Sequence, residues 1–259
     1  MSDYSLDNTW DHARRRLALL ESQLDPITHR RLQAIGLEAG WRCLEVGGGG
    51  GSVTHWLCEQ VGSGGHVLAT DIEPTLLEQV QHSQLEIRRH DILNDEPLPA
   101  EFDLVHARWL LHHLPDPVKA MRRMVSAVRP GGVIIFEEPD FFPYQVSKNE
   151  AYKAFISELA RVAVARSGGN SFWARHMLQA VGGLELKDVA VEGDQFLVHG
   201  GVGWAEFFSL TAMQVRESMV TPDGALSEDA FDAGISLLGD PEFIELGAAG
   251  IAVSGRKPT

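Results

Sequence analysis

The chain of 259 residues is predicted to fold as an α/β protein with a mostly parallel sheet. From Trp41 onward, short apolar runs alternate with segments of helical periodicity, which is typical of such a sheet. The run 43–57, CLEVGGGGGSVTHWL, has the order strand, tight turn, helix. The hydrophobic content of 44% is enough for a substantial core. With no internal repeat or low-complexity segment, we expect a single domain, 1–259.

Composition disfavours several classes of protein. A formal net charge of −14 argues against a nucleic-acid partner, because a phosphate backbone requires a surface of Lys and Arg. No apolar run approaches the roughly 18 residues of a membrane span, so we expect no membrane partner. The first residues, MSDYSLDNTWDHARRR, lack the basic-then-apolar order of a signal peptide. Cys43 and Cys58 fall in a predicted buried strand and helix, so we expect no disulfide and a cytoplasmic location.

Five consecutive glycines, 47–51, join a strand predicted over 41–46 to a helix over 52–61, with Ser52 as its N-cap. They could form an ordinary flexible loop, or a turn whose backbone a ligand approaches closely. The dinucleotide-binding pattern G-x-G-x-x-G fits in no register, because its last position falls on Ser52, Val53 or Thr54. The pattern E-x-G-x-G-x-G does fit; its residues are Glu45, Gly47, Gly49 and Gly51.

With this motif the chain resembles the class I S-adenosylmethionine (SAM) dependent methyltransferases. A carboxylate suits SAM because that molecule has no phosphate and carries an ammonium and a sulfonium group. The resemblance implies a Rossmann-like, seven-stranded sheet in which the last strand is antiparallel. It also implies a helical cap from the N-terminus and insertions after strands 5 and 6. Residues 41–140 would be the SAM-binding core.

Two acidic residues lie at the ends of the next strands. Strand 66–71 ends at Asp71, which is placed to accept hydrogen bonds from both ribose hydroxyls, with Ile72 beside it in the cofactor site. The alternative for Asp71 is a helix N-cap. Strand 85–90 is followed by Asp91 and Ile92, which the resemblance assigns to the adenine amino group and ring nitrogen. The alternative for Asp91 is a cap of its own strand.

Strand 102–106 precedes the run ARWLLHHLPDP, which resembles a segment of ubiquinone/menaquinone-methylating enzymes. His106 ends this strand at the carboxyl edge of the sheet, where ligands bind in open α/β folds, so it is a candidate SAM neighbour. Adjacent helical residues cannot share a face, so only one of His112 and His113 can face the site. The family pattern favours a structural role for His113. His106 and His112 are therefore candidate catalytic bases.

Asp116-Pro117 opens the next helix, and the turn RPGG at 129–132 leads into strand 133–137. Glu137, Glu138 and Asp140 crowd the end of that strand. Their mutual repulsion would raise one pKa, which makes Glu138 a candidate base. The alternative is a solvated acidic loop.

The remaining segments are assigned to caps and to the far edge of the sheet. Residues 1–40 are predicted as two helices, the second opening at Asp25-Pro26, with Tyr4 and Trp10 as lid residues. Residues 141–183 are predicted as a substrate cap of two helices, in which His176 is a further catalytic candidate. The candidate pocket-lining residues there are Phe141, Phe142, Tyr144, Phe172, Trp173 and His176.

The segment 184–259 is predicted to complete the sheet. We expect strand 6 over 184–191, an extended stretch over 194–199, helices over 204–219 and 228–238, and a last strand over 246–257. The resemblance places that last strand antiparallel between strands 5 and 6.

The sequence therefore predicts a SAM-dependent methyltransferase that acts on an O, N or C nucleophile of a small, apolar or aromatic metabolite and releases S-adenosylhomocysteine. Two alternatives stay open: a SAM-binding enzyme of another reaction, such as a cyclisation, and a SAM-binding protein without turnover. No metal is expected, because the His and acidic residues of 112–116 and 137–140 lack ligand spacing. The oligomeric state, including a homodimer, is left open.

Overall fold

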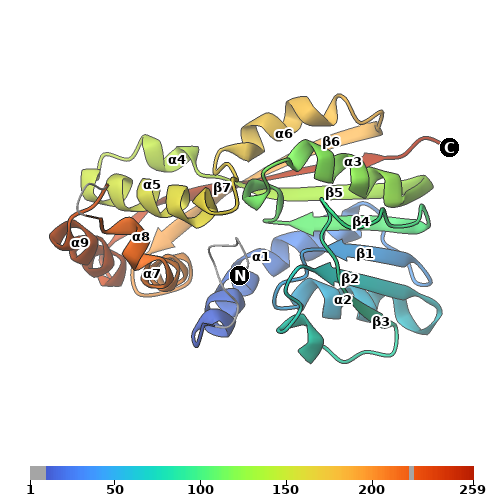
Figure 1. The fold of residues 1–259 in the computed structure, drawn as a ribbon, viewed down its shortest axis with the longest axis horizontal. Coiled ribbons are helices and arrows are strands. Elements are labelled where there is room, and N and C mark those ends of the chain that lie inside the picture. The colour runs from blue at the N-terminus through green and yellow to red at the C-terminus, as the bar shows by residue number, and fades with distance from the viewer. Residues whose placement is uncertain (1–9, 222–224) are drawn as a thin grey trace.

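The computed structural model describes residues 10–221 and 225–259, and Tyr4, a predicted lid residue, lies outside them. A sheet of seven strands in the order β3-β2-β1-β4-β5-β7-β6 forms its centre (Figure 1). β7 is antiparallel to both β5 and β6, and the other pairs are parallel. This confirms the predicted fold class. The strands are β1 (Arg42–Val46), β2 (His66–Asp71), β3 (Leu85–Arg89), β4 (Phe102–Arg108), β5 (Val128–Asp140), β6 (Lys187–His199) and β7 (Ile244–Arg256).

Helices cover both faces of the sheet. Their bounds are α1 (Ala13–Ala34), α2 (Ser52–Val61), α3 (Pro117–Ala127), α4 (Phe142–Gln145), α5 (Glu150–Ala165), α6 (Trp173–Val181), α7 (Trp204–Gln214), α8 (Arg216–Met219) and α9 (Glu228–Gly239), with short 3₁₀ turns η1 (Gly62–Gly64), η2 (Leu77–Gln79) and η3 (Leu111–His113). Strand side chains alternate between the two faces, so neighbouring residues enter different cores. Leu44 packs with α3 and α6 on one face, and Cys43 packs with α1 and α2 on the other.

The carboxyl ends of the central strands meet at one edge of the sheet. Val46 of β1 pairs with Thr70 of β2 and with Ala107 of β4, and Ala107 pairs with Phe136 of β5. On three of these strands the next residue is charged, and Asp71, Arg108 and Glu137 are thereby brought to the same edge. This edge is where open α/β sheets bind ligands.

A second lobe extends beyond the parallel part of the sheet. β6 and β7 continue past the end of β5, from Gln195 and Ala249 to His199 and Ile244. Helices α4, α5, α7, α8 and α9 gather around this two-stranded extension (Figure 1). Their shared core is rich in aromatic side chains; its largest members include Tyr144, Tyr152, Phe155, Phe196, Trp204, Phe207, Phe208 and Phe231. Burial of these rings is what stabilises the lobe.

Several segments differ from their predicted form. Residues 13–34 form one helix, not two, and Pro26 lies inside it. Asp25 does not cap a second helix, because its side chain contacts Arg108 and Ser52 instead. Strand 6 and the extended stretch after it form one continuous strand, with irregular register between Lys187 and Ala190. Strand 5 begins five residues earlier than predicted, at Val128.

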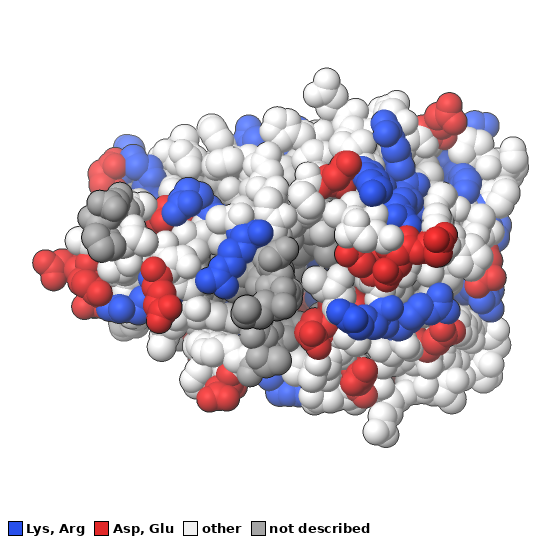
Figure 2. Space-filling view, viewed as in Figure 1, with Lys and Arg blue, Asp and Glu red and all other residues white. Residues whose placement is uncertain are grey.

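The surface carries charges of both signs. On the viewed face, Lys and Arg lie interleaved with Asp and Glu, and acidic side chains gather at the end of the second lobe near α9 (Figure 2). Glu228, Asp229 and Asp232 of α9 are exposed there. Within residues 10–221 and 225–259, no helix combines the length and the apolarity that crossing a membrane requires.

Candidate cofactor and acceptor site

The glycine loop has the backbone shape that the sequence predicted. Gly47, Gly49 and Gly51 all have positive φ, at 78°, 55° and 89°, a region that residues with a Cβ rarely adopt. Gly51 is the N-cap of α2, so Ser52 is its first residue and not the predicted N-cap. An added Cβ on Gly51 would overlap the Val80 side chain, whereas one on Gly49 would meet only the Gly47 carbonyl oxygen, at 4.0 Å. The loop is thus closely packed on one side and open at Gly49.

Asp71 lies beside this loop at the end of β2. Its Oδ2 accepts a hydrogen bond from the Gly49 N–H at 3.0 Å, and its Oδ1 accepts one from the Glu73 N–H at 2.9 Å. Burial raises the pKa of Asp71, and the backbone hydrogen bonds oppose that rise. Each carboxylate oxygen can accept a second hydrogen bond. The residues present therefore fit a ligand with two neighbouring hydroxyls.

The other predicted cofactor residues on this side differ in exposure. Asp91 accepts hydrogen bonds from the N–H groups of Leu93 and Asn94 and from the Asn94 side chain, which is the capping geometry named as its alternative. Partial burial raises the pKa of Asp91, but these hydrogen bonds outweigh it and lower the pKa. Ile92 is 6% exposed and belongs to the core, whereas Ile72 is 43% exposed. Their contact with a cofactor stays a prediction.

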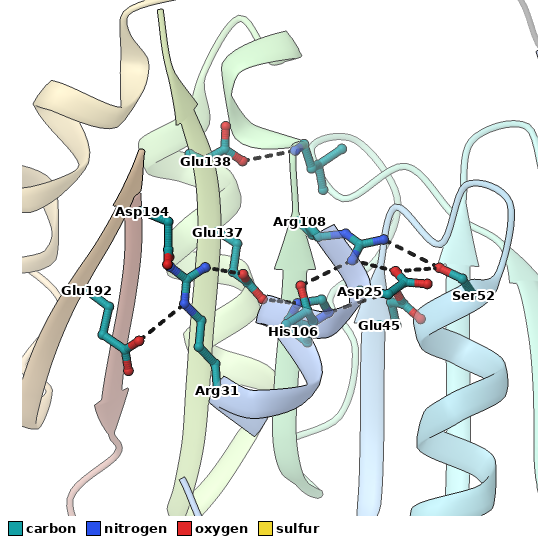
Figure 3. A network of polar contacts seen from close by, with 12 residues as sticks. Asp25, Arg31, Glu45, Ser52, His106, Arg108, Glu137, Glu138, Glu192 and Asp194 are labelled. Atoms are coloured by element: carbon teal, nitrogen blue, oxygen red, sulfur yellow. Dashed lines mark hydrogen bonds and ion pairs between the residues drawn. The ribbon is translucent and has the colours of Figure 1, made fainter. Parts of the chain in front are cut away.

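A buried row of charged residues runs from β1 to β5 below the loop (Figure 3). Glu45 of β1 accepts a hydrogen bond from the Thr54 hydroxyl of α2. The His106 ring of β4 is fully buried between two carboxylates: its Nδ1 lies 3.8 Å from Glu45 Oε1, and its Nε2 lies 3.2 Å from Glu137 Oε1. Burial lowers the pKa of His106, but the interactions with Glu137 and Glu45 outweigh it, so the pKa is raised. The two carboxylates therefore favour the protonated form of the ring that lies between them.

Helix α1 continues this row from the other side. Arg31 donates to Glu137 Oε2 at 2.5 Å and also pairs with Asp194 of β6. Burial would raise the pKa of Glu137, but the hydrogen bond from His106 and the charges of His106, Arg31 and Arg108 lower it to about 2. The rise predicted for one pKa among these three acids is therefore not found at Glu137. Successive residues of β5 point to opposite faces, which separates Glu137 from Glu138.

A second contact fixes α1 over the glycine loop. Asp25 Oδ1 accepts hydrogen bonds from Arg108 Nη1 at 2.8 Å and from Ser52 Oγ at 2.9 Å. Arg108 also donates to the Thr28 hydroxyl at 3.1 Å. The carboxylate of Glu21 lies against Gly50, and burial followed by the charge of Asp25 raises the pKa of Glu21. Helix α1 is thereby held across the carboxyl edge of the sheet by charged groups (Figure 3).

Glu138 faces the other side of the strand and holds the turn after β4. Its Oε1 accepts hydrogen bonds from the N–H groups of Leu110 and Leu111, at 2.9 and 2.8 Å. Its Oε2 accepts from the His112 N–H and from His112 Nδ1, at 3.0 and 2.7 Å. His112 and His113 are both buried, 3% and 9% exposed. A catalytic role for Glu138 or His112 stays a prediction, because these four hydrogen bonds are internal to the fold.

His176 is separate from this cluster. It is exposed on α6, which packs against β5 through Met177 on the core side. Asp140 pairs with Arg175 of the same helix at 3.0 Å, and the Arg175 guanidinium lies over the Phe142 ring. Among the candidate pocket-lining residues, Phe141 and Tyr144 pack into the second lobe, and Trp173 packs into the core below β5. The predicted lid residue Trp10 is half-buried, with its ring edge-on to His12.

The described residues contain no group of three or more His, Cys, Asp or Glu side chains that could hold a metal ion. Cys43 and Cys58 are both free and buried. Burial raises the pKa of Cys58 to about 12 and raises that of Cys43 as well, so neither thiol is reactive at neutral pH.

The network partners Asp25, Arg31 and Asp194 were not predicted from the sequence. Arg31 lies in the RR pair of a helix with an apolar stripe, a pattern that usually indicates a solvated face. Its partner Glu137 lies 106 residues away. Neither local periodicity nor a motif indicates such a contact.

Comparison with known proteins finds methyltransferases among the proteins that are similar to this chain. Residues 44–134 match the family model of a methyltransferase domain. A ubiquinone/menaquinone biosynthesis C-methyltransferase of Vibrio vulnificus is 33% identical over 119 residues, which cover 42% of this chain and 46% of that protein. A methyltransferase of Strobilurus tenacellus, str2, is 24% identical over 228 residues, which cover 85% of this chain and 80% of that protein. The chain thus spans about half the length of the curated C-methyltransferase that it matches.

Among solved structures, phosphoethanolamine N-methyltransferase 2 of Haemonchus contortus superposes with a TM-score of 0.63 at 16% identity. The match covers 100% of this chain and 61% of that chain. At this identity the likeness shows the fold. The domain match over residues 44–134 and this shared fold agree with the resemblance to class I SAM-dependent methyltransferases that the motifs indicated.

Proposed function

We propose that this protein transfers the methyl group of SAM to a nucleophilic O, N or C atom of a small apolar or aromatic molecule. The observation that carries the proposal is the pairing of the glycine loop with Asp71 at the carboxyl edge of the sheet. Gly49 is open to a ligand, and the Asp71 carboxylate keeps acceptor capacity for two hydroxyls. The Vibrio and Strobilurus relatives, named as methyltransferases, and the Haemonchus structure, solved with S-adenosylhomocysteine, support SAM as the methyl donor.

The residues of this chain would divide the work as follows. Asp71 would accept the ribose hydroxyls, and the 47–51 loop would allow close approach of the cofactor to the backbone. Glu45, held by Thr54 and His106, would place negative charge near the cationic part of the cofactor. Asp91 and Ile92 would contact the adenine. SAM supplies an electrophilic methyl group on a sulfonium that is a good leaving group.

Alignment is then the main contribution of the protein to the rate. Reacting groups held in line can reach effective molarities of about 10⁵–10⁸ M. A base is required only where the nucleophile must lose a proton, and for that case His106, His112, His176 and Glu138 remain candidates. Of these, His106 lies in the charged row next to Glu45.

A cytoplasmic location and a small-molecule acceptor, with no nucleic acid or membrane as partner, belong to the same proposal. The net charge of −14 and the mixed charges of the face in Figure 2 disfavour a nucleic-acid partner, and the two free cysteines suit a reducing cytoplasm. A homodimer would be detected by sedimentation of the purified protein.

The test begins with calorimetric titration of the protein with SAM and, separately, with NADH. We expect SAM to bind and NADH not to bind. S-adenosylhomocysteine release is then followed over a panel of phenols, aromatic amines and polyketide-like acceptors. Acceptor-dependent release supports the proposal, and the absence of SAM binding refutes it.

The matched variants are Asp71→Asn and Glu86→Gln. Asp71→Asn should weaken SAM binding about 10- to 100-fold, because it removes a charged acceptor of hydrogen bonds. Glu86 is an exposed carboxylate on neighbouring β3, and its substitution should leave the dissociation constant unchanged. Equal affinities of the wild type and Asp71→Asn would contradict the ribose assignment. Thermal unfolding of both variants checks that the fold is retained.

A further inference from the structure

Trp109 has an unusual backbone for a bulky residue. It directly follows β4 and has φ of +53°, one of only three non-glycine residues with positive φ in the part of the chain that the structure describes. Such a conformation costs on the order of 1–3 kcal/mol and persists only where surrounding contacts hold it. Here the Trp109 N–H donates to the Glu137 carbonyl oxygen at 2.7 Å, and the next residue, Leu110, donates to Glu138. The sheet itself therefore fixes the direction of the Trp109 side chain.

The Trp109 ring is the outermost member of an aromatic stack. It lies parallel to the Trp204 ring, with centroids 5.4 Å apart and an interplanar angle of 20°. Trp204 in turn stacks on Phe196 and on Phe208, at 4.9 and 5.8 Å. These three inner rings are buried, whereas Trp109 is only partly buried.

The remaining neighbours of Trp109 contact it edge-on. Phe141, Phe207 and His112 lie 6.1, 6.2 and 6.1 Å from it, at interplanar angles of 72°, 76° and 90°. Among the described residues, Trp204 is thus the only ring stacked on Trp109. Because the Trp109 ring is partly exposed and only one of its faces carries a stacked ring from the described residues, the other face suits a planar ligand.

This stack ends next to the cofactor loop. Leu110 packs on Gly47, where an added Cβ would lie 3.2 Å from a Leu110 methyl carbon. On the other side of Trp109, Arg108 contacts Ser52 at the start of α2. Trp109 therefore stands between the glycine loop and the aromatic core of the second lobe, where a methyl acceptor would have to bind.

We propose that Trp109 determines acceptor specificity by stacking the ring face that Trp204 does not cover on a planar aromatic acceptor, which the protein would thereby prefer over a saturated one. This inference rests on the proposed function and narrows its substrate class. In the transfer step, the nucleophilic atom of the acceptor forms a bond to the methyl carbon. The C–S bond breaks with its electron pair staying on sulfur, and any proton on the nucleophile passes to water or to a neighbouring base.

The test compares planar and saturated probes: 2-naphthol against decahydro-2-naphthol, and phenol against cyclohexanol. Binding is measured by calorimetry at saturating S-adenosylhomocysteine for the wild type, Trp109→Phe and Trp109→Leu. We expect the wild type to bind 2-naphthol at least tenfold more tightly than its saturated analogue. Trp109→Phe should keep most of that preference, and Trp109→Leu should abolish it.

The matched control is Trp56→Leu. Trp56 is another half-buried, stacked tryptophan, 4.2 Å from the His29 ring, and it lies on α2 away from the second lobe. This control should keep the full preference for 2-naphthol. Retention of the preference in Trp109→Leu, or equal binding of planar and saturated probes by the wild type, would overturn the inference.

The design separates this inference from the proposed function. SAM and S-adenosylhomocysteine affinities are measured for every variant, and they should match the wild type within about twofold. Failure of the wild type to bind SAM and S-adenosylhomocysteine refutes the proposed function. Normal binding of both compounds without a Trp109-dependent preference refutes only the acceptor assignment.

Discussion

Glu137→Gln should remove a large part of the stability of the protein, and in a pH-dependent way. The pKa of Glu137 is about 2 in the folded protein and ordinarily 4.5, a difference worth about 3 kcal/mol. Because the folded pKa is lowered, this contribution is present above pH 4.5 and is lost as pH falls toward 2. Its side chain is 5% exposed, so solvent screening reduces this value little.

The contribution of His106 to stability depends on pH in the opposite direction. Its pKa is raised in the folded state, so its contribution is complete below the ordinary 6.5 and is lost as pH rises through the folded pKa. The two contributions are therefore present together between about pH 4.5 and 6.5. Loss of Glu137 also leaves Arg31 and His106 with less compensation for their buried charge. Removing one partner of a buried pair costs about 3–5 kcal/mol, in agreement with the value from the pKa.

The assay is urea unfolding of the wild type and the variant from pH 3 to pH 8. We expect Glu137→Gln to lose about 3 kcal/mol at pH 6 and to lose much less additional stability between pH 4.5 and 3 than the wild type does. Glu101→Gln is the matched control, because its pair with Arg42 is exposed at 44% and 45% and should contribute less than about 1 kcal/mol. Two results would refute the inference that the Glu137 carboxylate stabilises the buried charged row. One is a loss below 1 kcal/mol at pH 6, and the other is a variant that loses as much stability between pH 4.5 and 3 as the wild type does.

Two further substitutions test the loop and helix α1. Gly51→Ala should lower the free energy of unfolding by about 1–2 kcal/mol and weaken SAM binding, because Gly51 has a φ of +89° and an added Cβ would overlap Val80. The control is Gly62→Ala, since Gly62 has a φ of +62° but no neighbour within 4 Å of an added Cβ. This control should leave the SAM affinity unchanged. Equal SAM affinities of both variants in calorimetry would argue against the loop as the cofactor contact. Pro26→Ala should raise the free energy of unfolding by about 1–2 kcal/mol, because it restores a hydrogen bond inside α1. A decrease in urea unfolding experiments would instead indicate that Pro26 stabilises the position from which Asp25 contacts Arg108.

The parallel sheet and the glycine loop were predictable because they depend on local pattern, whereas the antiparallel place of the last strand was implied by the family resemblance. Alternating strands and helices imply parallel neighbours, and the spacing of Glu45, Gly47, Gly49 and Gly51 distinguished this loop from a dinucleotide-binding one. Helix α1 was predicted in two parts because Asp-Pro usually marks a helix start. The structure continues the helix through Pro26, since Asp25 finds partners in Arg108 and Ser52.

The charged row and the aromatic stack could not be predicted, for a different reason. Both depend on side chains far apart in sequence, such as Arg31 with Asp194 and Trp109 with Trp204. The separation of Glu137 from Glu138 could have been predicted, because side chains alternate along a strand and these two must point to opposite faces. From the sequence we predicted them as one crowded cluster. The positive φ of Trp109, by contrast, has no local signal, since a bulky residue is disfavoured there.

These two neighbouring glutamates of β5 organise the two halves of the proposed site. Glu137 fixes His106 and Arg31, and through them Glu45 and helix α1, on the side of the glycine loop. Glu138 fixes the turn after β4, and the Glu137 carbonyl oxygen holds the N–H of Trp109. The cofactor side and the acceptor side of the proposed site are thus both held in place by consecutive residues of one central strand, β5. In-line transfer requires the two reactants to be aligned closely, and a shared rigid strand provides that alignment without a moving part.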